Sequence, residues 1–377
     1  MTRRVLFHVQ YLLGIGHLQR SLRIAEALSE RGVAVTFVHG GPPLSVLDGL
    51  RGIEMVQLPP IRARDATFAL VDERGNPVDD DLRAARRERL LAMFADARPD
   101  AVVIEGYPFA RRAFRFELDP LIAAARAAGS RVVCSVRDLP TVRDDPERHR
   151  DIVDRVRADF DLVLVHGDPG FIPFAVPFPP AARIADRVVY TGYVTTQACP
   201  LDGPVPGGEV LVSVGGGAAG QALLAAALEA RRQGCLADRP WRILAGATLT
   251  DTVFAAIRRE APGGVVVERF RGDFPALLRH CHVSVSQAGY NTVLDIIGAR
   301  ARAVLVPFSA ERETEQLIRA EHLARLGGAV LVRESELTPA RLAAAIERAA
   351  SGPAVPLAID MGGAARSAAE IVGLIGA

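Results

Sequence analysis

The stretch VSVSQAGYNTVLD, residues 283–295, contains a short strand, a turn and the beginning of a helix. Val283–Val285 is typical of a buried strand, and Gly289 turns the chain into a helical pattern that opens at Tyr290–Thr292. The first N–H groups of a helix have no partner within it, and the helix dipole favours negative charge there. The stretch therefore predicts a binding site for an anionic group such as a diphosphate.

Further polar side chains follow in an order that suits a nucleotide sugar. Asp295 lies one helical turn beyond Asn291, on the same side, where its carboxylate can accept from both hydroxyls of a ribose. The pair Glu315-Gln316 begins another helix after a strand that ends at Val306-Pro307-Phe308, and it can hold sugar hydroxyls. The ordered set, more than any one of these elements, indicates a donor site.

Valine-rich runs alternate with amphipathic helical patterns along both halves of the chain, which predicts two α/β domains with parallel, doubly wound sheets. The expected strands are Val5–Val9, Val33–Val38, Ala101–Ile104, Arg131–Ser135, Asp161–Val165, Glu209–Val214, Trp241–Leu244, Val265–Glu268, Val283–Val285, Ala303–Val306 and Ala329–Leu331. We expect a first domain at residues 1–192, a linker rich in Thr, Pro and Gly at 193–208, and a second domain at 209–361. Residues 362–377 are expected to form a helix that crosses back onto the first domain.

Net charge, cysteine spacing and the lengths of apolar runs argue against several classes of protein. The 377 residues carry a formal net charge of +1, which argues against a nucleic-acid binder. The four cysteines are far apart and show no metal-ligand spacing, as in a reduced cytosolic protein. No apolar run of about 18 residues is present, and the apolar N-terminal run is broken by His8 and Gln10, which favours a buried strand over a signal peptide. We expect a protein in the cytoplasm, free or peripheral to the membrane.

A second motif, GIGHLQR at residues 14–20, lies between the first strand and its helix. The dinucleotide fingerprint needs a third glycine and an acidic residue after the second strand, and neither is present, so NAD and FAD are disfavoured. Gly14 and Gly16 allow the backbone to approach a ligand. His17 lies at a helix N-terminus, where the dipole opposes a cation and a neutral imidazole can act as a base. A histidine that only caps the turn is the structural alternative.

Glu105 ends the strand Ala101–Ile104, and the parallel arrangement places it at the same sheet edge as His17. A carboxylate there can accept the other ring N–H of His17 and fix its tautomer. Such a pair would deprotonate a hydroxyl or a water. A solvated glutamate at a strand end is the equally weighted alternative.

Three further segments leave structural alternatives open. Gly215–Gly217 follows the first strand of the second domain and suits either a nest of N–H groups around an anion or a tight packing turn. The arginines at 83, 86, 87 and 89 are expected to form a solvated helix face. Residues 61–90 contain a polar insertion that is expected to be a mobile loop.

These motifs resemble the two-domain nucleotide-sugar glycosyltransferases of the GT-B fold, and among them the family-28 enzymes typified by the N-acetylglucosaminyltransferase that forms lipid II. Residues 287–295 also look like the donor signature HCGWNSTLE of UDP-glycosyltransferases. The resemblance implies that Gly289 to Thr292 hold the diphosphate, that Asp295 holds the ribose, and that Glu315 and Gln316 hold the donor sugar. It implies a nucleobase beside Phe270-Arg271, a catalytic base at His17 and a carboxylate partner at Glu105. The full expected donor set is Gly14, Gly16, Gly215, Gly216, Gly217, Phe270, Arg271, Gln287, Gly289, Tyr290, Asn291, Thr292, Asp295, Glu315 and Gln316.

The Gly-x-Gly-His-x-x-Arg form of residues 14–20 is also similar to the UDP-sugar hydrolase of pseudaminic acid biosynthesis, in which the histidine helps water attack the sugar. The leading hypothesis is an inverting transferase, without metal or other cofactor, that moves a sugar from a nucleotide donor, a UDP-sugar above all, to a hydroxyl acceptor. The acceptor could be a small molecule, a glycan or a lipid-linked molecule. The hydrolase and a non-catalytic nucleotide-sugar-binding subunit are the alternatives.

Overall fold

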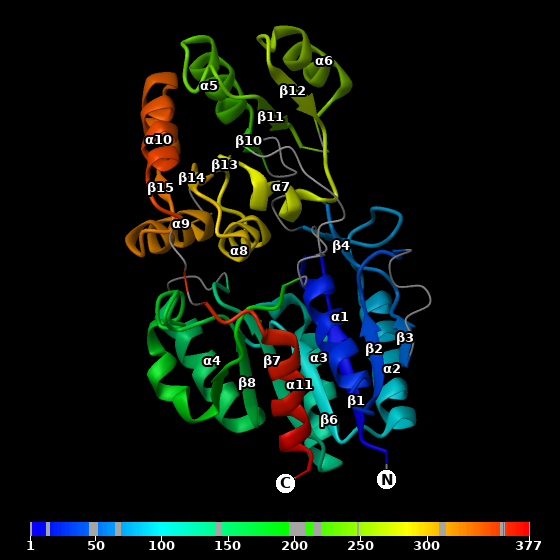
Figure 1. Cartoon of the computed structure of the whole chain (residues 1–377). Helices are drawn as coiled ribbons and strands as arrows, with labels where there is room; N and C mark the ends of the chain where they lie inside the picture. The colour runs from blue at the N-terminus through cyan, green and yellow to red at the C-terminus, as the bar shows by residue number, and fades with distance from the viewer. Residues whose placement is uncertain are drawn as a thin grey trace. The chain divides into compact units, whose positions relative to one another are not determined.

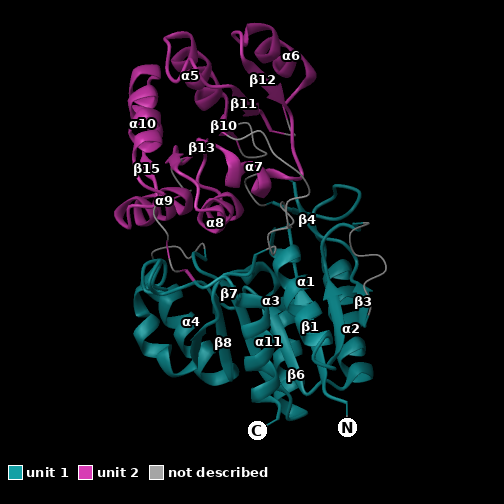
Figure 2. Ribbon diagram, in the orientation of Figure 1, with its two compact units in different colours: residues 1–195, 360–377 teal, residues 196–359 magenta. Residues whose placement is uncertain are grey.

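The structure, a computed structural model, describes residues 2–12, 16–44, 52–64, 69–140, 145–195, 208–214, 220–246, 249–308, 314–354, 357 and 359–376. The chain divides into two compact units (Figure 2): Met1–Thr195 together with Asp360–Ala377, and Thr196–Ile359. Residues 1–192 of the expected first domain thus fall in the first unit. The expected second domain, 209–361, falls in the second unit up to Ile359.

Among the described residues, the first unit has a parallel sheet of seven strands in the order β3-β2-β1-β6-β7-β8-β9. The strands are β1 (Arg4–Val9), β2 (Ala34–His39), β3 (Ile53–Gln57), β6 (Ala101–Glu105), β7 (Arg131–Arg137), β8 (Leu162–His166) and β9 (Val188–Tyr190). Every residue of β6 is buried, because helices cover both faces of the sheet. This explains why its sequence is a continuous apolar run up to the final glutamate.

Helices lie on both faces of this sheet (Figure 1). Leu6 belongs to a core shared with α2, α3 and α4, whereas Phe7 belongs to a core shared with α1 and α11. The helices are α1 (Gly16–Ser29), α2 (Asp80–Ala97), α3 (Arg115–Ala127), α4 (Pro146–Asp159) and α11 (Gly363–Leu374), with short 3-10 helices η2 (Arg112–Phe114) and η3 (Pro179–Arg187). This alternation is the doubly wound arrangement that the sequence pattern predicts.

The second unit repeats the scheme in its described part, with six parallel strands in the order β12-β11-β10-β13-β14-β15. The strands are β10 (Val210–Ser213), β11 (Trp241–Leu244), β12 (Val265–Glu268), β13 (Val283–Ser286), β14 (Ala303–Leu305) and β15 (Val330–Leu331). The helices are α5 (Gln221–Arg232), α6 (Asp251–Glu260), α7 (Phe274–His280), α8 (Tyr290–Ala299), α9 (Glu315–Arg325) and α10 (Pro339–Ser351), with η5 (Glu334–Glu336). The predicted fold class, two parallel-sheet α/β domains, is confirmed.

The C-terminal helix α11 belongs to the first unit, where it packs against α1 through a shared apolar core. The segment that leads into α11 is held by a hydrogen bond of 2.7 Å from Tyr193 N–H to the carbonyl oxygen of Asp360. Gly363 begins the helix so close to this segment that a Cβ atom there would lie 2.5 Å from the Gly192 carbonyl oxygen. A glycine is therefore required where α11 joins the first unit.

The segment of residues 61–90 is more ordered than its polar composition suggests. Its described part contains the antiparallel pair β4 (Arg62–Ala63) and β5 (Leu70–Val71), followed by α2. Asp79 caps α2 by accepting a hydrogen bond from Leu82 N–H at 2.8 Å. Ile61 and Val71 are fully buried, so the described part of this segment is anchored by apolar residues and is not the mobile loop that its polar composition predicts.

The expected solvated arginine face of α2 is wrong for Arg86, whose side chain is fully buried. Its guanidinium donates two hydrogen bonds of 2.7 Å to Glu117 of α3, and one of 2.9 Å to the side-chain oxygen of Gln10. Arg86, Leu90 and Phe94 are the buried residues of α2 and follow one another at four-residue intervals. That spacing places Arg86 on the buried stripe of the helix, so the signal was present in the sequence.

Replacing Arg86 with methionine should lower the free energy of unfolding of the first unit by about 3–5 kcal/mol, because it leaves Glu117 as a buried, uncompensated charge. Urea unfolding followed by far-ultraviolet circular dichroism measures the change, and the fluorescence of Trp241 reports on the second unit. The matched control is Arg83→Met on the same helix, where the side chain is 46% exposed and the expected loss is below about 1 kcal/mol. Equal losses in the two variants would contradict the assignment.

Candidate active site

The first candidate site lies at the carboxyl edge of the first sheet. Strands β1 and β6 are parallel neighbours, so the turn after β1 and the end of β6 meet at this edge. His17 is the second residue of α1, and Glu105 is the last residue of β6. Gly16 is the first residue of α1, and Gly14 lies outside the described residues. The doubly wound topology thus brings together two side chains that are 88 positions apart in the sequence.

His17 and Glu105 form a direct pair, with 2.6 Å between His17 Nδ1 and Glu105 Oε1. The Glu105 side chain is 1% exposed and that of His17 is 30% exposed, so the imidazole reaches the surface while the carboxylate is enclosed. An ionised carboxylate can only accept, so the proton in this contact belongs to Nδ1. Nε2 then carries the lone pair, which is the arrangement needed for a base.

Arg20 and Arg111 complete the surroundings of the carboxylate. Arg20 Nη2 donates to Glu105 Oε1 at 2.9 Å, and Arg111 Nη2 donates to Oε2 at 3.2 Å. Burial by itself would raise the pKa of Glu105, but His17, Arg111 and Arg20 outweigh it and hold that pKa well below its usual value. Glu105 is therefore a permanent carboxylate at neutral pH.

The pKa of His17 is lowered to about 4, mainly by burial; Arg111 and Arg20 add to the shift, and Glu105 opposes it. The imidazole is therefore neutral over the whole physiological range, which a base requires before the reaction begins. A solvated glutamate at the strand end does not describe Glu105, and a turn-capping role alone does not account for the orientation of His17 toward the carboxylate.

A layer of buried polar side chains supports this edge of the sheet. His166 at the end of β8 contacts Ser135 Oγ through Nε2 at 2.7 Å and Thr191 Oγ1 through Nδ1 at 3.0 Å. Burial, with a contribution from Arg20, lowers the pKa of His166 to about 3. A neutral His166 thus satisfies both hydroxyls and keeps the ends of β7 and β8 in place beneath Glu105.

The second candidate site is the start of α8 in the second unit. Gly289 has extended backbone angles, and the first intrahelical bond runs from Val293 N–H to the Gly289 carbonyl at 3.0 Å. No side chain caps this helix in the part of the chain that the structure describes, so the N–H groups of Tyr290, Asn291 and Thr292 point out of the helix end. Asn291 is exposed, as an anion-binding helix start requires.

Residues around this helix start are held by a polar cluster that the sequence did not reveal. Gln316 Oε1 accepts from the N–H groups of Ala288 and Phe308, both at 3.1 Å, and so ties the turn before α8 to the end of the next strand. Glu315 accepts from Arg319 at 2.9 Å. The carbonyl oxygen of Gln316 therefore has a structural task.

The remaining predicted donor residues are placed as follows. Gln287 is buried, and Asp295 is half-buried on α8. Phe270, after the end of β12, is 72% exposed, while Arg271 forms a bidentate pair with Asp273 at 2.6 and 2.8 Å. Gly215, Gly216 and Gly217 lie outside the described residues.

Sequence reasoning missed Arg111 and Arg319. Arg319 is fully buried, and its guanidinium lies 5.3 Å from the centre of the Tyr290 ring. It is four residues after Glu315 on α9, so helical spacing could have paired the two. Arg111 lies in an irregular loop, and no sequence period predicts that it turns back to Glu105.

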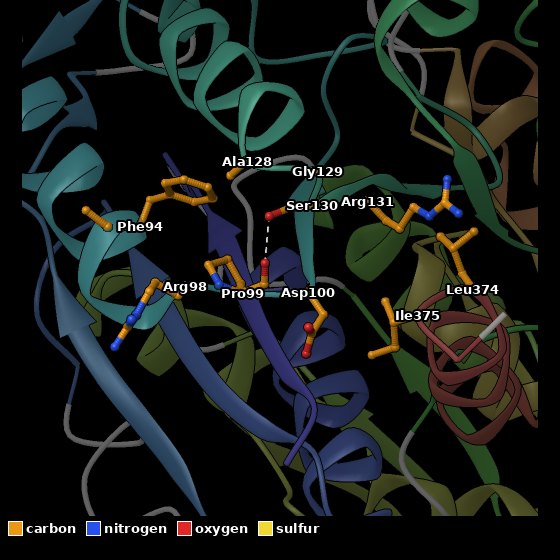
Figure 3. Close-up of a pocket in the computed structure, with 11 residues that line it drawn as sticks. Phe94, Arg98, Pro99, Asp100, Ala128, Gly129, Ser130, Arg131, Leu374 and Ile375 are labelled. Atoms are coloured by element: carbon orange, nitrogen blue, oxygen red, sulfur yellow. Dashed lines mark hydrogen bonds between the residues drawn. The ribbon is translucent and has the colours of Figure 1, made fainter. Parts of the chain in front are cut away.

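A separate hollow lies at the opposite, amino edge of the first sheet (Figure 3). It has a volume of about 640 Å³ and is lined by residues that precede β6 and β7, together with the end of α11. Ser130 closes part of it by donating to the Pro99 carbonyl at 2.6 Å. Since β6 runs from this edge to Glu105, the hollow is remote from His17 and takes no part in its chemistry.

In the described ranges, no three His, Cys, Asp or Glu side chains are grouped so that they could hold a metal ion. The helices of those ranges include none that is long and apolar enough to cross a bilayer.

Comparison with known proteins identifies the class of enzyme. Residues 211–371 match the glycosyltransferase family 28 C-terminal domain. A UDP-N-acetylglucosamine–N-acetylmuramyl-(pentapeptide) pyrophosphoryl-undecaprenol N-acetylglucosamine transferase of Rhodopseudomonas palustris is 24% identical over 344 residues, which is 90% of this chain and 85% of the relative. The enzyme of the same name from Rhodospirillum centenum is 26% identical over 363 residues, which is 91% of this chain and 85% of the relative.

The chain is a GT-B glycosyltransferase similar to family 28. Solved structures agree on the fold of this glycosyltransferase. CalG4, the calicheamicin glycosyltransferase, matches with a TM-score of 0.68 at 20% identity and covers 100% of this chain and 99% of its own. MurG of Acinetobacter baumannii matches with a TM-score of 0.63 at 17% identity, with 99% of each chain covered. The predicted resemblance and the predicted enzyme class are confirmed.

The low pKa of His17 predicts a pH dependence of stability. An unfolded chain binds a proton at His17 below pH 6.5, whereas the folded glycosyltransferase resists it down to about pH 4, so the free energy of unfolding must fall as the pH falls through this window. His17→Gln removes this titration, and its loss of stability between pH 6.5 and 4.5 should be about 2 kcal/mol smaller than in the wild type. Urea unfolding at both pH values measures the difference. Identical losses would mean that His17 titrates normally in the fold.

Proposed function

We propose that this glycosyltransferase moves a sugar from a UDP-sugar to an acceptor hydroxyl, with inversion at the anomeric carbon and without a metal ion. The observation that carries the proposal is the His17–Glu105 pair at 2.6 Å, in which the carboxylate is enclosed and the His17 side chain is 30% exposed. The names of the relatives support a UDP-sugar donor, because each includes UDP-N-acetylglucosamine. Their acceptor, a lipid-linked one by name, supports a hydroxyl acceptor of the glycan or lipid-linked kind.

In the proposed reaction, His17 Nε2 takes the proton of the acceptor hydroxyl. The hydroxyl oxygen forms a bond to the anomeric carbon as the bond from that carbon to the diphosphate oxygen breaks, and UDP leaves with the electron pair. Glu105 stabilises the imidazolium that results, while Nδ1–H keeps the ring oriented. A base of this kind contributes about 10²–10⁴-fold to the rate.

The start of α8 would hold the donor diphosphate. Backbone N–H groups of Tyr290, Asn291 and Thr292 donate in the direction in which charge develops on the leaving group, and their dipoles need no rearrangement during the reaction. This is why the proposal needs no metal. Asp295 would accept from the ribose hydroxyls, Phe270 would lie by the nucleobase, and Glu315 with the NH₂ of Gln316 would contact the sugar.

The alternatives are less well supported. A hydrolase would use the same base on water, but the family match and the relatives are transferases. A non-catalytic binding subunit requires the His17–Glu105 pair to be out of reach of the donor, and the relatives, which are named as transferases, do not support it.

His17→Ala should lower turnover by about 10²–10⁴-fold while the dissociation constant for the nucleotide stays within a factor of about two. Proton NMR of the purified enzyme with a panel of UDP-sugars, first alone and then with acceptors, follows UDP release and the anomer of the product. EDTA should leave the wild-type rate unchanged. The control is His282→Ala, at the amino edge of the second sheet, which should retain full turnover. An active His17→Ala enzyme would remove the base from the mechanism, and rapid release of free sugar without acceptor would show a hydrolase.

Asp295→Ala should weaken binding of UDP by about 1–3 kcal/mol, because the ribose hydroxyls lose their acceptor. Isothermal titration calorimetry of the nucleotide gives the dissociation constant directly. Asp238→Ala, an exposed carboxylate before β11, serves as the control with unchanged affinity. An unaltered constant for Asp295→Ala would refute the ribose role.

A further inference from the structure

The Glu105 carboxylate is surrounded more completely than a simple histidine–carboxylate pair requires. Oε1 accepts from His17 Nδ1 and Arg20 Nη2, and Oε2 accepts from Arg111 Nη2. The side chains of Arg20 and Arg111 are 5% and 12% exposed, so both cations are largely withdrawn from water. Two guanidinium groups against one carboxylate leave a positive excess beside a neutral imidazole.

Arg111 occupies a backbone conformation that argues for a specific task. Its φ of 62° and ψ of 21° lie in the left-handed region, which disfavours every residue with a Cβ atom and suits glycine. The loop is fixed on both sides by buried aromatic rings: Phe109 packs edge-on against Phe174 and Phe178, each at 5.2 Å between ring centres, and Phe114 is fully buried. The fold therefore holds an arginine in a strained conformation and directs its guanidinium to Glu105.

We propose that Arg111 is a positioning residue that, together with Arg20, keeps both oxygens of Glu105 occupied and thereby fixes His17 as the Nδ1–H tautomer. With Oε2 held by Arg111, Oε1 remains the acceptor for His17. Without Arg111, Oε2 loses this hydrogen bond, and the imidazole loses one of its two cationic neighbours. The link to catalysis rests on the proposed function, whereas the effect on His17 itself does not.

The charged and titratable groups around the pair support this assignment. His17 faces Glu105 from β6, Arg20 from its own helix and Arg111 from the loop before η2. Two further titratable groups sense Glu105: Cys134 of β7, whose pKa burial raises, and His166 of β8, whose pKa burial lowers. Both are neutral, so Arg20 and Arg111 are the cations that oppose a proton on His17.

The test is a pH titration of the full chain labelled with ¹⁵N-histidine, with the His17 signal assigned by its loss in His17→Gln. In the wild type the ring should remain the Nδ1–H tautomer down to about pH 4. In Arg111→Met the midpoint should rise by about one pH unit, because a positive neighbour has been removed. Arg111→Gly should raise it equally, and this variant relieves the backbone strain, so loss of the fold cannot account for its result.

Two control variants distinguish the effect of a cation at position 111 from the effect of the overall charge of the loop. Arg111→Lys keeps the charge and should keep the wild-type midpoint to within a few tenths of a pH unit. Arg112→Met removes the exposed neighbouring cation and should also leave it in place. The proposal is overturned if Arg111→Met and Arg111→Gly titrate as the wild type does, or if Arg112→Met shifts the midpoint as far as they do.

The acid limb of kcat/KM gives a second readout, and it should move upward by the same amount in Arg111→Met as the NMR midpoint does. A shifted NMR midpoint in an enzyme that turns over no UDP-sugar would leave the role of Arg111 intact and refute the proposed function. An unshifted midpoint in an Arg111→Met enzyme that still turns over UDP-sugar would refute the role of Arg111 and leave the proposed function intact.

Discussion

A carboxylate buried at the end of a central strand is the constraint on which the first unit's site depends. Glu105 is 1% exposed, and an ionised group so far from water is tolerated only when each of its oxygens has a partner. Two chain segments supply those partners: α1 with His17 and Arg20, and the loop before η2 with Arg111. The orientation of the base is thus a consequence of satisfying one buried charge.

The proposed diphosphate site of the second unit would attract an anion in a different way. At the start of α8 the attraction comes from backbone N–H groups rather than from exposed cations, and the polar side chains nearby are occupied in holding that backbone. Gln316 is an example, because its side-chain carbonyl oxygen accepts hydrogen bonds from two loops. Arg319, buried beneath Tyr290, is likewise part of the support. A preformed N–H cradle loses little by reorganisation when charge develops on a leaving group.

Sequence patterns predicted the structure best for strands that are buried on both faces of a sheet, because such strands need a continuous apolar run. The apolar run Ala101–Ile104 predicted that Glu105 ends a strand at the same sheet edge as His17, and the parallel topology follows from the alternation with helices. Patterns were least reliable for charged residues. Arg86 was assigned to a solvated face because arginine is usually exposed, although its spacing with Leu90 and Phe94 places it on the buried stripe of α2.

The sequence by itself determined the α/β class, the position of His17 at a helix start, the strand-end location of Glu105 and the helix that opens at Tyr290. These are local properties, since they depend on periodicity and turn residues within short windows. Only the tertiary structure decided that His17 and Glu105 touch, that Arg111 returns to the same carboxylate, and that Arg86 and Glu117 form a buried pair. Those contacts join segments from 6 to 88 residues apart through irregular loops and strand order, for which a single sequence carries no periodic signal.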